Sequence, residues 1–223
     1  MADTALQRKN MVESQVRPSD VTDRRIIAAM LEIPREEFVP DAMRPLAYMD
    51  GDVTMAASQP GRPPRALMAP RVFAKLLDLA QLERGDVVLD VGTGSGYSSA
   101  VIGKLVETVV ALEVNAELAK RAAAALTALT LDNIAVVQGD LAKGWASAGP
   151  YAAILIEGAI SVAPDALLAQ LKDGGRLVAI VKDGSTSKAV VWQRRADRCD
   201  RREEFDAAAP VIPGFERAKV FSL

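Results

Sequence analysis

A glycine loop placed directly after a short apolar run is the sequence feature that most constrains how this chain folds. The apolar run 87–91 leads straight into Gly92, Gly94 and Gly96. A run bounded in this way is typical of a buried strand, and glycines let the backbone turn sharply and approach a ligand closely. We therefore expect a cofactor to bind at the end of this strand. The predicted cofactor-binding residues of the loop are Asp90, Gly92, Thr93, Gly94, Ser95 and Gly96.

From this loop onward, apolar runs alternate with helical patterns. Further strands are predicted at 109–113, 134–137, 152–156 and 176–181, and helices at 98–105, 116–129 and 164–171. Two late segments, 189–193 and 218–221, could add strands that pair antiparallel. Short connections between strands and helices indicate an α/β fold, a Rossmann-like doubly wound and mostly parallel sheet of seven strands.

The N-terminal part has a different pattern. Residues 11–50 are helical and amphipathic, with Ser19 or Asp20 as the cap of a helix that ends at Pro34. Glycines and prolines then predict a long loop at 51–66. We expect an N-terminal helical segment with a substrate-side loop at 1–70 and the cofactor-binding domain at 71–223, together forming one structural unit.

Composition limits the chemistry and the partners. The 223 residues contain no histidine, which excludes serine–histidine and cysteine–histidine nucleophiles and histidine zinc sites. The single cysteine, Cys199, favours a reduced, cytoplasmic setting. The net charge of −2 and the mixed signs argue against nucleic-acid binding, and the charged stretch 194–204 is interpreted as a solvated turn. No apolar run is long enough to span a membrane. Oligomeric state is not determined by these features.

The spacing of the loop separates two classes of cofactor. A dinucleotide fingerprint has glycine at its sixth position, where this chain has Tyr97, so a nicotinamide oxidoreductase is disfavoured. Asp90 suits a ligand with an amino group. Glu113, at the end of the second strand, could accept both hydroxyls of a ribose. Asp140, followed by Leu141, could accept an adenine amino hydrogen. Alternatively, each acid only caps the following helix or turn.

Four stretches carry a resemblance to a known family: 21–40, 88–97, 139–145 and 166–177. They are similar to the protein-L-isoaspartate O-methyltransferase family. The resemblance implies S-adenosylmethionine as the cofactor and methyl transfer to the side-chain carboxylate of an isoaspartyl residue in a protein or peptide. A carboxylate is already ionised at neutral pH and needs no general base, which agrees with the missing histidine.

The sequence departs from this family where the methyl acceptor is expected. The family has a Thr-Ile-Ser-Gln-Pro type motif, and counting back from Gly92 places Met68 at its serine. Matching Ser58 instead would need extra residues in the following helix. Met68 cannot donate a hydrogen bond. Met68 and Glu157 are therefore the predicted residues of the reaction site by this resemblance.

Glu157 ends the fourth strand, where a carboxylate would repel a carboxylate substrate unless a cation compensates it. Arg62, Arg65 and Arg71 could supply that cation or lie in solvent. Glu157 could instead act as a base, bind a cationic substrate or cap a helix. Two alternative functions stay open: a methyltransferase of the same fold with another acceptor, and a non-catalytic module that binds the cofactor and regulates a partner.

Overall fold

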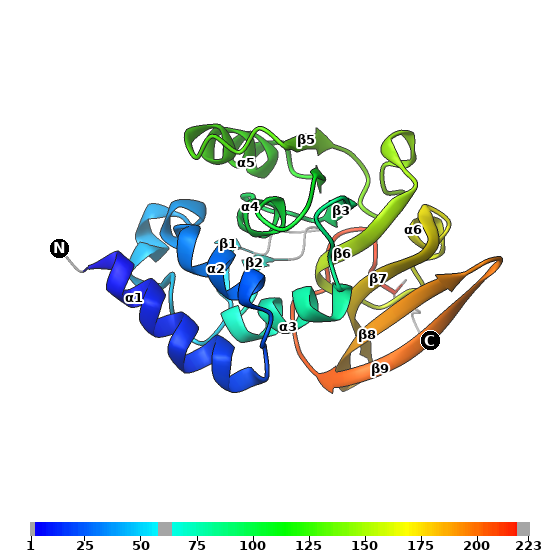
Figure 1. The fold of residues 1–223 in the computed structure, drawn as a ribbon, viewed down its shortest axis with the longest axis horizontal. Helices are drawn as coiled ribbons and strands as arrows, with labels where there is room; N and C mark the ends of the chain where they lie inside the picture. Colours follow the sequence, from blue (N-terminus) through cyan, green and yellow to red (C-terminus); the bar gives the residue numbers. More distant parts are fainter. Residues whose placement is uncertain (1–2, 58–63, 218–223) are drawn as a thin grey trace, which may run out of the picture.

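The computed structural model describes residues 3–57 and 64–217. Its centre is a seven-stranded sheet of order β5-β4-β3-β6-β7-β8-β9, parallel from β5 to β7 and antiparallel at β8 and β9. This confirms the predicted doubly wound, mostly parallel α/β sheet (Figure 1). The strands are β3 (Val87–Val91), β4 (Thr108–Glu113), β5 (Ile134–Gln138), β6 (Tyr151–Ile160), β7 (Leu171–Asp183), β8 (Thr186–Arg195) and β9 (Arg198–Asp206).

Helices cover the sheet on both sides. The α-helices are α1 (Thr4–Met11), α2 (Arg24–Glu32), α3 (Pro70–Ala80), α4 (Tyr97–Gly103), α5 (Ala116–Ala128) and α6 (Asp165–Leu168). A π-helical turn, η1 (Val12–Val16), and 3₁₀ turns follow: η2 (Arg17–Ser19), η3 (Arg35–Phe38), η4 (Asp41–Leu46) and η5 (Ala146–Ala148). A separate two-stranded sheet pairs β1 (Val53–Ala56) with β2 (Arg65–Leu67) antiparallel.

Alternation along the strands divides the apolar residues between two cores. Val88 of β3 packs in one core with side chains of α2, α3, α4 and α5, whereas Leu89 and Val91 pack in the other with Leu167 of α6 and Phe215. The first core therefore joins the N-terminal helical segment to the sheet. Asp90 points to the same side as Val88, because successive strand residues face opposite sides.

Four local predictions were wrong. The charged stretch after Ala196 continues as β9, an exposed edge strand whose charges lie in water, where they also discourage pairing with another chain. Helix α2 is capped by Asp23, whose carboxylate accepts from the Arg25 amide, because Asp20 adopts a left-handed conformation further upstream. The stretch 51–66 contains β1 and begins β2. The helix predicted at 164–171 spans only α6, and its last residues begin β7. The strand predicted at 218–221 lies outside the described residues.

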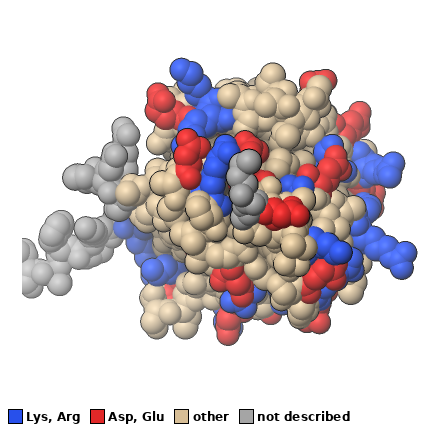
Figure 2. Space-filling model, turned by 90° about the vertical axis from the view of Figure 1, so that its left-hand side faces the viewer, with Lys and Arg blue, Asp and Glu red and all other residues tan. Residues whose placement is uncertain are grey.

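Charges of both signs are interspersed on the surface. On the face shown in Figure 2, lysine and arginine side chains alternate with aspartate and glutamate. Among the described residues, no helix combines the length and the apolar character needed to cross a bilayer.

A buried arginine fastens the N-terminal segment to the sheet. The Arg35 side chain is fully buried, and its guanidinium donates to the carbonyl oxygens of Ala47 (2.7 Å) and Met68 (2.7 Å). The guanidinium also lies 4.8 Å from the centre of the Tyr97 ring. Burial lowers the pKa of Arg35, and the Tyr97 side chain opposes that shift. Three separate parts of the chain thus meet at one cation.

We expect Arg35→Ala to lower the free energy of unfolding by about 3 kcal/mol or more, because two buried carbonyl oxygens lose their donors. Urea unfolding followed by circular dichroism measures this loss. Arg44→Ala is the control, because Arg44 is exposed and pairs at the surface with Glu37 and Asp41, so its removal should cost less than about 1 kcal/mol. Equal effects of the two substitutions would contradict the role given to Arg35.

Candidate functional site

The glycine loop joins the end of β3 to α4 and has a backbone that favours glycine. Gly94 and Gly96 have φ values of +61° and +98°, in the left-handed region that other residues rarely adopt. A Cβ on Gly96 would also lie 3.1 Å from the Ala122 Cβ of α5, so glycine permits the close approach of that helix. The amide of Gly92 donates to the Leu112 carbonyl oxygen of β4 at 2.8 Å. The loop is therefore rigidly placed at the carboxyl ends of β3 and β4.

Hydroxyl groups of the loop and of α4 hold the Asp90 side chain. Ser98 Oγ donates to Asp90 Oδ2 at 2.6 Å, and Ser99 donates to the same oxygen. Thr93 Oγ1 lies 2.8 Å from Ser99 Oγ and extends this network. Among residues 3–57 and 64–217, the buried Asp90 Oδ1 atom has no hydrogen-bond partner. Burial raises the pKa of Asp90 to about 6, although the hydroxyl groups act in the opposite direction.

Glu113, at the end of β4, is bound by an arginine from the N-terminal part. Its carboxylate forms a bidentate ion pair with Arg65, with 2.7 Å from Nη1 to Oε1 and 2.9 Å from Nη2 to Oε2. Both side chains are buried, with exposed fractions of 4% for Arg65 and 0% for Glu113. Arg65 Nη2 also donates to the Gly92 carbonyl oxygen at 2.8 Å. Arg65 is thus neither a solvated charge nor free to neutralise a substrate in this conformation.

Backbone amides complete the coordination of the Glu113 carboxylate. Gly94 donates to Oε2 at 2.8 Å, and Val114 and Asn115 each donate to Oε1 at 3.0 Å. Together with Arg65, they engage both carboxylate oxygens, so a ribose could bind Glu113 only by replacing Arg65.

Two apolar side chains cover the same loop. Met55 of β1 packs directly on Gly94, where an added Cβ would overlap its Cε, and its Sδ lies 3.2 Å from Ser95 Oγ. Ser95 Oγ donates to the Phe38 carbonyl oxygen, so it faces the N-terminal segment. On the other side, Ile212 Cδ1 lies 3.4 Å from the place that a Cβ on Gly92 would take. In this conformation the glycine loop is buried under side chains of the chain itself.

The third predicted acid lies nearer the surface. Asp140 follows β5, and its Oδ1 accepts from the Ala142 amide at 3.0 Å. Its side chain is half exposed, whereas Leu141 is buried in the second core and contacts Gly92. Asp90, Glu113 and Asp140 thus stand on three neighbouring strands or directly after them, as the sequence predicted. Of the three, only Asp140 is open to solvent.

The two predicted residues of the reaction site are both buried. Met68 follows β2, packs in the first core and is held through its carbonyl oxygen by Arg35. Glu157 lies in β6, two residues beyond Leu155, which pairs in register with Asp90. The pairing of β6 with β7 is irregular between Leu155 and Ala159, so strand alternation does not fix the direction of the Glu157 side chain. The charge of Asp90 acts on the Glu157 carboxyl, so these two side chains lie near each other. They flank the switch point between β3 and β6, where ligands of such sheets bind.

The Glu157 carboxyl has an unusual environment. Its Oε1 atom is buried and has no hydrogen-bond partner in the part of the chain that the structure describes. Burial, reinforced by the nearby Asp90 carboxyl, raises the pKa of Glu157 well above its ordinary value, and Arg35 and Arg65 oppose this only in part. The protonated, neutral carboxyl is therefore favoured, and a neutral carboxyl can donate a hydrogen bond.

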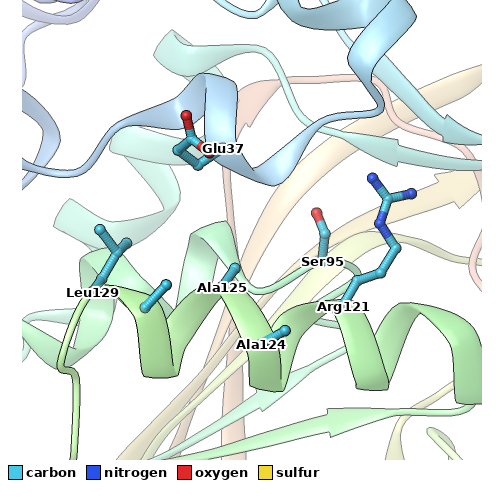
Figure 3. A pocket seen from close by; sticks show the side chains of 7 residues that line it. Glu37, Ser95, Arg121, Ala124, Ala125 and Leu129 are labelled. Atoms are coloured by element: carbon cyan, nitrogen blue, oxygen red, sulfur yellow. The ribbon is translucent and has the colours of Figure 1, made fainter.

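An open groove of about 460 Å³ lies beside the glycine loop but away from these acids. Figure 3 shows Glu37 on one side and the small side chains of α5 on the other, with Ser95 and Arg121 at one end. Neither Asp90 nor Glu113 lines this groove. Since a cofactor of this fold binds at the carboxyl ends of the strands, we do not assign it to the groove.

Sequence reasoning missed Met55 and treated Arg65 only as one of several arginines in a loop. One sequence signal did point to Arg65, because an arginine that directly precedes the apolar residues Ala66 and Leu67 is atypical of a solvated turn. No sequence signal pointed to Glu113 as its partner. Arg62 lies outside the described residues, and Arg71 is exposed and pairs with Asp50.

Known proteins share this architecture. A protein-L-isoaspartate O-methyltransferase structure superposes with a TM-score of 0.80 at 24% identity, covering 93% of this chain and 66% of that longer one. A Plasmodium falciparum protein solved in complex with S-adenosyl-L-homocysteine gives a TM-score of 0.77 at 18% identity, covering 98% and 100% of the two chains. These likenesses show a Rossmann-like fold with the glycine loop at the carboxyl end of β3.

Sequence comparison identifies the family. The model of the protein-L-isoaspartate(D-aspartate) O-methyltransferase family matches residues 6–211. Protein-L-isoaspartate O-methyltransferase 1 of Rhodopseudomonas palustris (strain HaA2) is 36% identical, covering 94% of this chain and 83% of the relative. The enzyme of Koribacter versatilis is 37% identical, covering 93% and 91%. The chain belongs to this family, which confirms the resemblance noted in the sequence.

The raised pKa of Asp90 predicts a pH dependence of stability. Between its ordinary pKa of 3.8 and the folded value of about 6, the folded state keeps a proton that the unfolded chain has lost. Stability therefore falls as pH rises through this window, by about 3 kcal/mol at most for this one group. We expect Asp90→Asn to lose this part of the decline, as measured by urea unfolding at pH 4 and pH 7.

Asp132→Asn serves as the control, because Asp132 lies exposed in a turn and should leave the pH dependence of the wild type unchanged. If the Asp90→Asn variant declined as steeply between the two pH values as the wild type, Asp90 would be ionised in the folded state.

Proposed function

We propose that this chain transfers the methyl group of S-adenosylmethionine to the side-chain carboxylate of an isoaspartyl residue in a protein or peptide, in the cytoplasm. The observation that carries the proposal is family membership over residues 6–211, joined to a glycine loop with acids at neighbouring strand ends. The single cysteine, Cys199, is free, which agrees with a reduced compartment.

The residues at the strand ends fit the cofactor in type and position. Glu113 provides carboxylate acceptors suited to ribose hydroxyls, Asp90 has an unpartnered buried oxygen, and Asp140 is accessible beyond β5. Thr93 and Ser95 shape the loop, and Leu141 forms an apolar wall. The space in front of Glu113 and Gly94, however, holds Arg65 and Met55. The candidate site thus has residue types suited to the cofactor, and Arg65 and Met55 close it in this conformation.

The bound cofactor would supply an electrophilic methyl group, and the residues of the chain would hold the acceptor and the methyl group in position. An acceptor carboxylate is ionised at neutral pH, so no side chain has to remove a proton from it. Catalysis then depends on holding the acceptor oxygen in line with the methyl group and on excluding water. The absence of histidine from the sequence imposes no limit on such a reaction.

Glu157 is our proposed acceptor-binding residue. Met68 stands where the family has a serine, and it has no hydrogen to donate. Glu157 lies near Asp90, and among the described residues its buried Oε1 atom has no hydrogen-bond partner. As a neutral acid it would donate a hydrogen bond to the acceptor carboxylate rather than repel it. A carboxyl donor would thus replace a hydroxyl donor at the acceptor site.

Transfer of a labelled methyl group to an isoaspartyl peptide tests the function. We expect label to enter the isoaspartyl peptide and not the same peptide with ordinary aspartate. In Glu157→Gln, which keeps a donor, transfer should persist, whereas in Glu157→Leu the KM for the peptide should rise about tenfold or more. Leucine should not weaken the fold, because it replaces an unpartnered buried group.

Two results would count against these assignments. Binding of S-adenosylhomocysteine without transfer to any isoaspartyl peptide would indicate another acceptor or a non-catalytic module. Equal KM values in the Gln and Leu variants would remove Glu157 from the acceptor site.

The serine position gives a second prediction. We expect Met68→Ser to transfer methyl groups to the isoaspartyl peptide faster than Met68→Ala. Both variants leave a similar cavity in the first core, which by itself costs about 2–4 kcal/mol of stability, and only the serine restores a hydroxyl donor. Initial rates measured at a temperature where both variants are folded give the comparison. Identical rates would show that position 68 does not reach the acceptor.

A further inference from the structure

The β1–β2 pair meets the glycine loop at the two points that a bound cofactor would need. Arg65 of β2 engages both oxygens of Glu113 and the carbonyl oxygen of Gly92. Met55 of β1 packs on Gly94, with its Sδ 2.9 Å from the place of a Cβ. One strand supplies a hydrogen-bond donor to the acceptors of the loop, and the other supplies an apolar cover.

The guanidinium of Arg65 presents hydrogen-bond donors, the same kind of group that a ligand of this site would need. A carboxylate and a carbonyl oxygen converge on one point, and a ligand that binds there has to present hydrogen-bond donors. A guanidinium presents several donors in a fixed plane and pairs with a carboxylate through two parallel hydrogen bonds. Arg65 therefore satisfies a donor requirement that, in the proposed function, belongs to the hydroxyls of the cofactor.

The side chains of Arg65 and Met55 can leave the glycine loop without disrupting the central sheet. In the part of the chain that the structure describes, β1 and β2 form a two-stranded sheet that does not pair with the seven-stranded one. Val53 of β1 and Leu67 of β2 are buried in the first core and anchor the pair, so the movement needed is that of the two side chains. The opposite wall is different, because the Ile212 segment is bonded to β6 through the Ala159 amide and carbonyl.

The Glu113 carboxylate keeps other partners when Arg65 leaves. Three backbone amides, those of Gly94, Val114 and Asn115, donate to it independently of Arg65. The negative charge would therefore stay solvated by fixed dipoles, and it would be accessible to a neutral hydroxyl ligand. The glycine loop therefore does not require the ion pair between Arg65 and Glu113.

We infer that Arg65 and Met55 hold the site in a self-closed state, in which the β1–β2 pair competes with the cofactor for Glu113 and Gly94. This inference rests on the proposed function, since it takes Glu113 as part of the cofactor site. Binding then requires that the Arg65 and Met55 side chains withdraw from Glu113 and Gly94, so the apparent affinity is the intrinsic affinity reduced by the fraction of open molecules.

Calorimetric titration with S-adenosylhomocysteine tests this competition. We expect the Kd of Arg65→Gln to be about tenfold lower than that of the wild type or lower still, because the closed state loses its ion pair. Met55→Ala should also lower the Kd, and it decides the question if Arg65→Gln fails to fold. The matched controls are Arg44→Gln and Met49→Ala, two exposed side chains whose replacement should change the Kd less than about twofold.

The outcomes separate the inference from the proposed function. If the wild type binds and both Arg65→Gln and Met55→Ala bind equally or more weakly, the closed state is wrong while the cofactor site stands. If neither the wild type nor either variant binds at millimolar ligand, the cofactor assignment fails together with the closure. Tighter binding of both variants and unchanged controls support the inference.

Discussion

The structure depends on one buried cation that joins three parts of the chain. Arg35 comes from the N-terminal segment, binds the carbonyl oxygens of Ala47 and Met68, and lies over the ring of Tyr97 at the start of α4. Tyr97 in turn contacts Phe38 and Phe73, with ring centres 5.7 Å away in both cases. The residue that separates this loop from a dinucleotide fingerprint is therefore also the residue onto which the N-terminal layer packs.

The same layer creates the electrostatics of the site. By covering the ends of β3, β4 and β6, the N-terminal layer buries three carboxyl groups. The burial of each carboxyl is compensated in a different way. Asp90 receives hydroxyl donors, Glu113 receives an arginine and backbone amides, and Glu157 keeps an oxygen without a partner. Burial, reinforced by Asp90, raises the pKa of Glu157 well above its ordinary value, whereas the Glu113 carboxylate forms an ion pair with Arg65.

Family membership covers residues 6–211. In the proposed function, Met68 and Glu157 stand in place of the residue types that the resemblance implies beside the acceptor. β2 joins the two proposed halves of the site, because it carries Arg65 to Glu113 and leads into Met68. A change at β2 would therefore affect both halves of the proposed reaction.

Sequence alone determined the parallel strands, the glycine loop and the positions of Asp90, Glu113 and Asp140 at strand ends, because each follows from a local pattern. An apolar run makes a buried strand, and parallel strands bring their carboxyl ends to one edge. Sequence did not predict β9, because an exposed edge strand carries charges where a buried one carries apolar residues. The boundaries at α2 and α6 were also set by packing and capping that no simple periodicity shows.

Only the tertiary structure decided what faces the cofactor site. Arg65 and Glu113 are 48 residues apart, and their pairing depends on how β2 is laid across the end of β4. No periodic pattern encodes that placement, since it results from the packing of the N-terminal layer on Tyr97 and Arg35. The sequence thus specified Glu113, the carboxylate proposed to bind a ribose. The fold specified that Arg65 pairs with this carboxylate in this conformation.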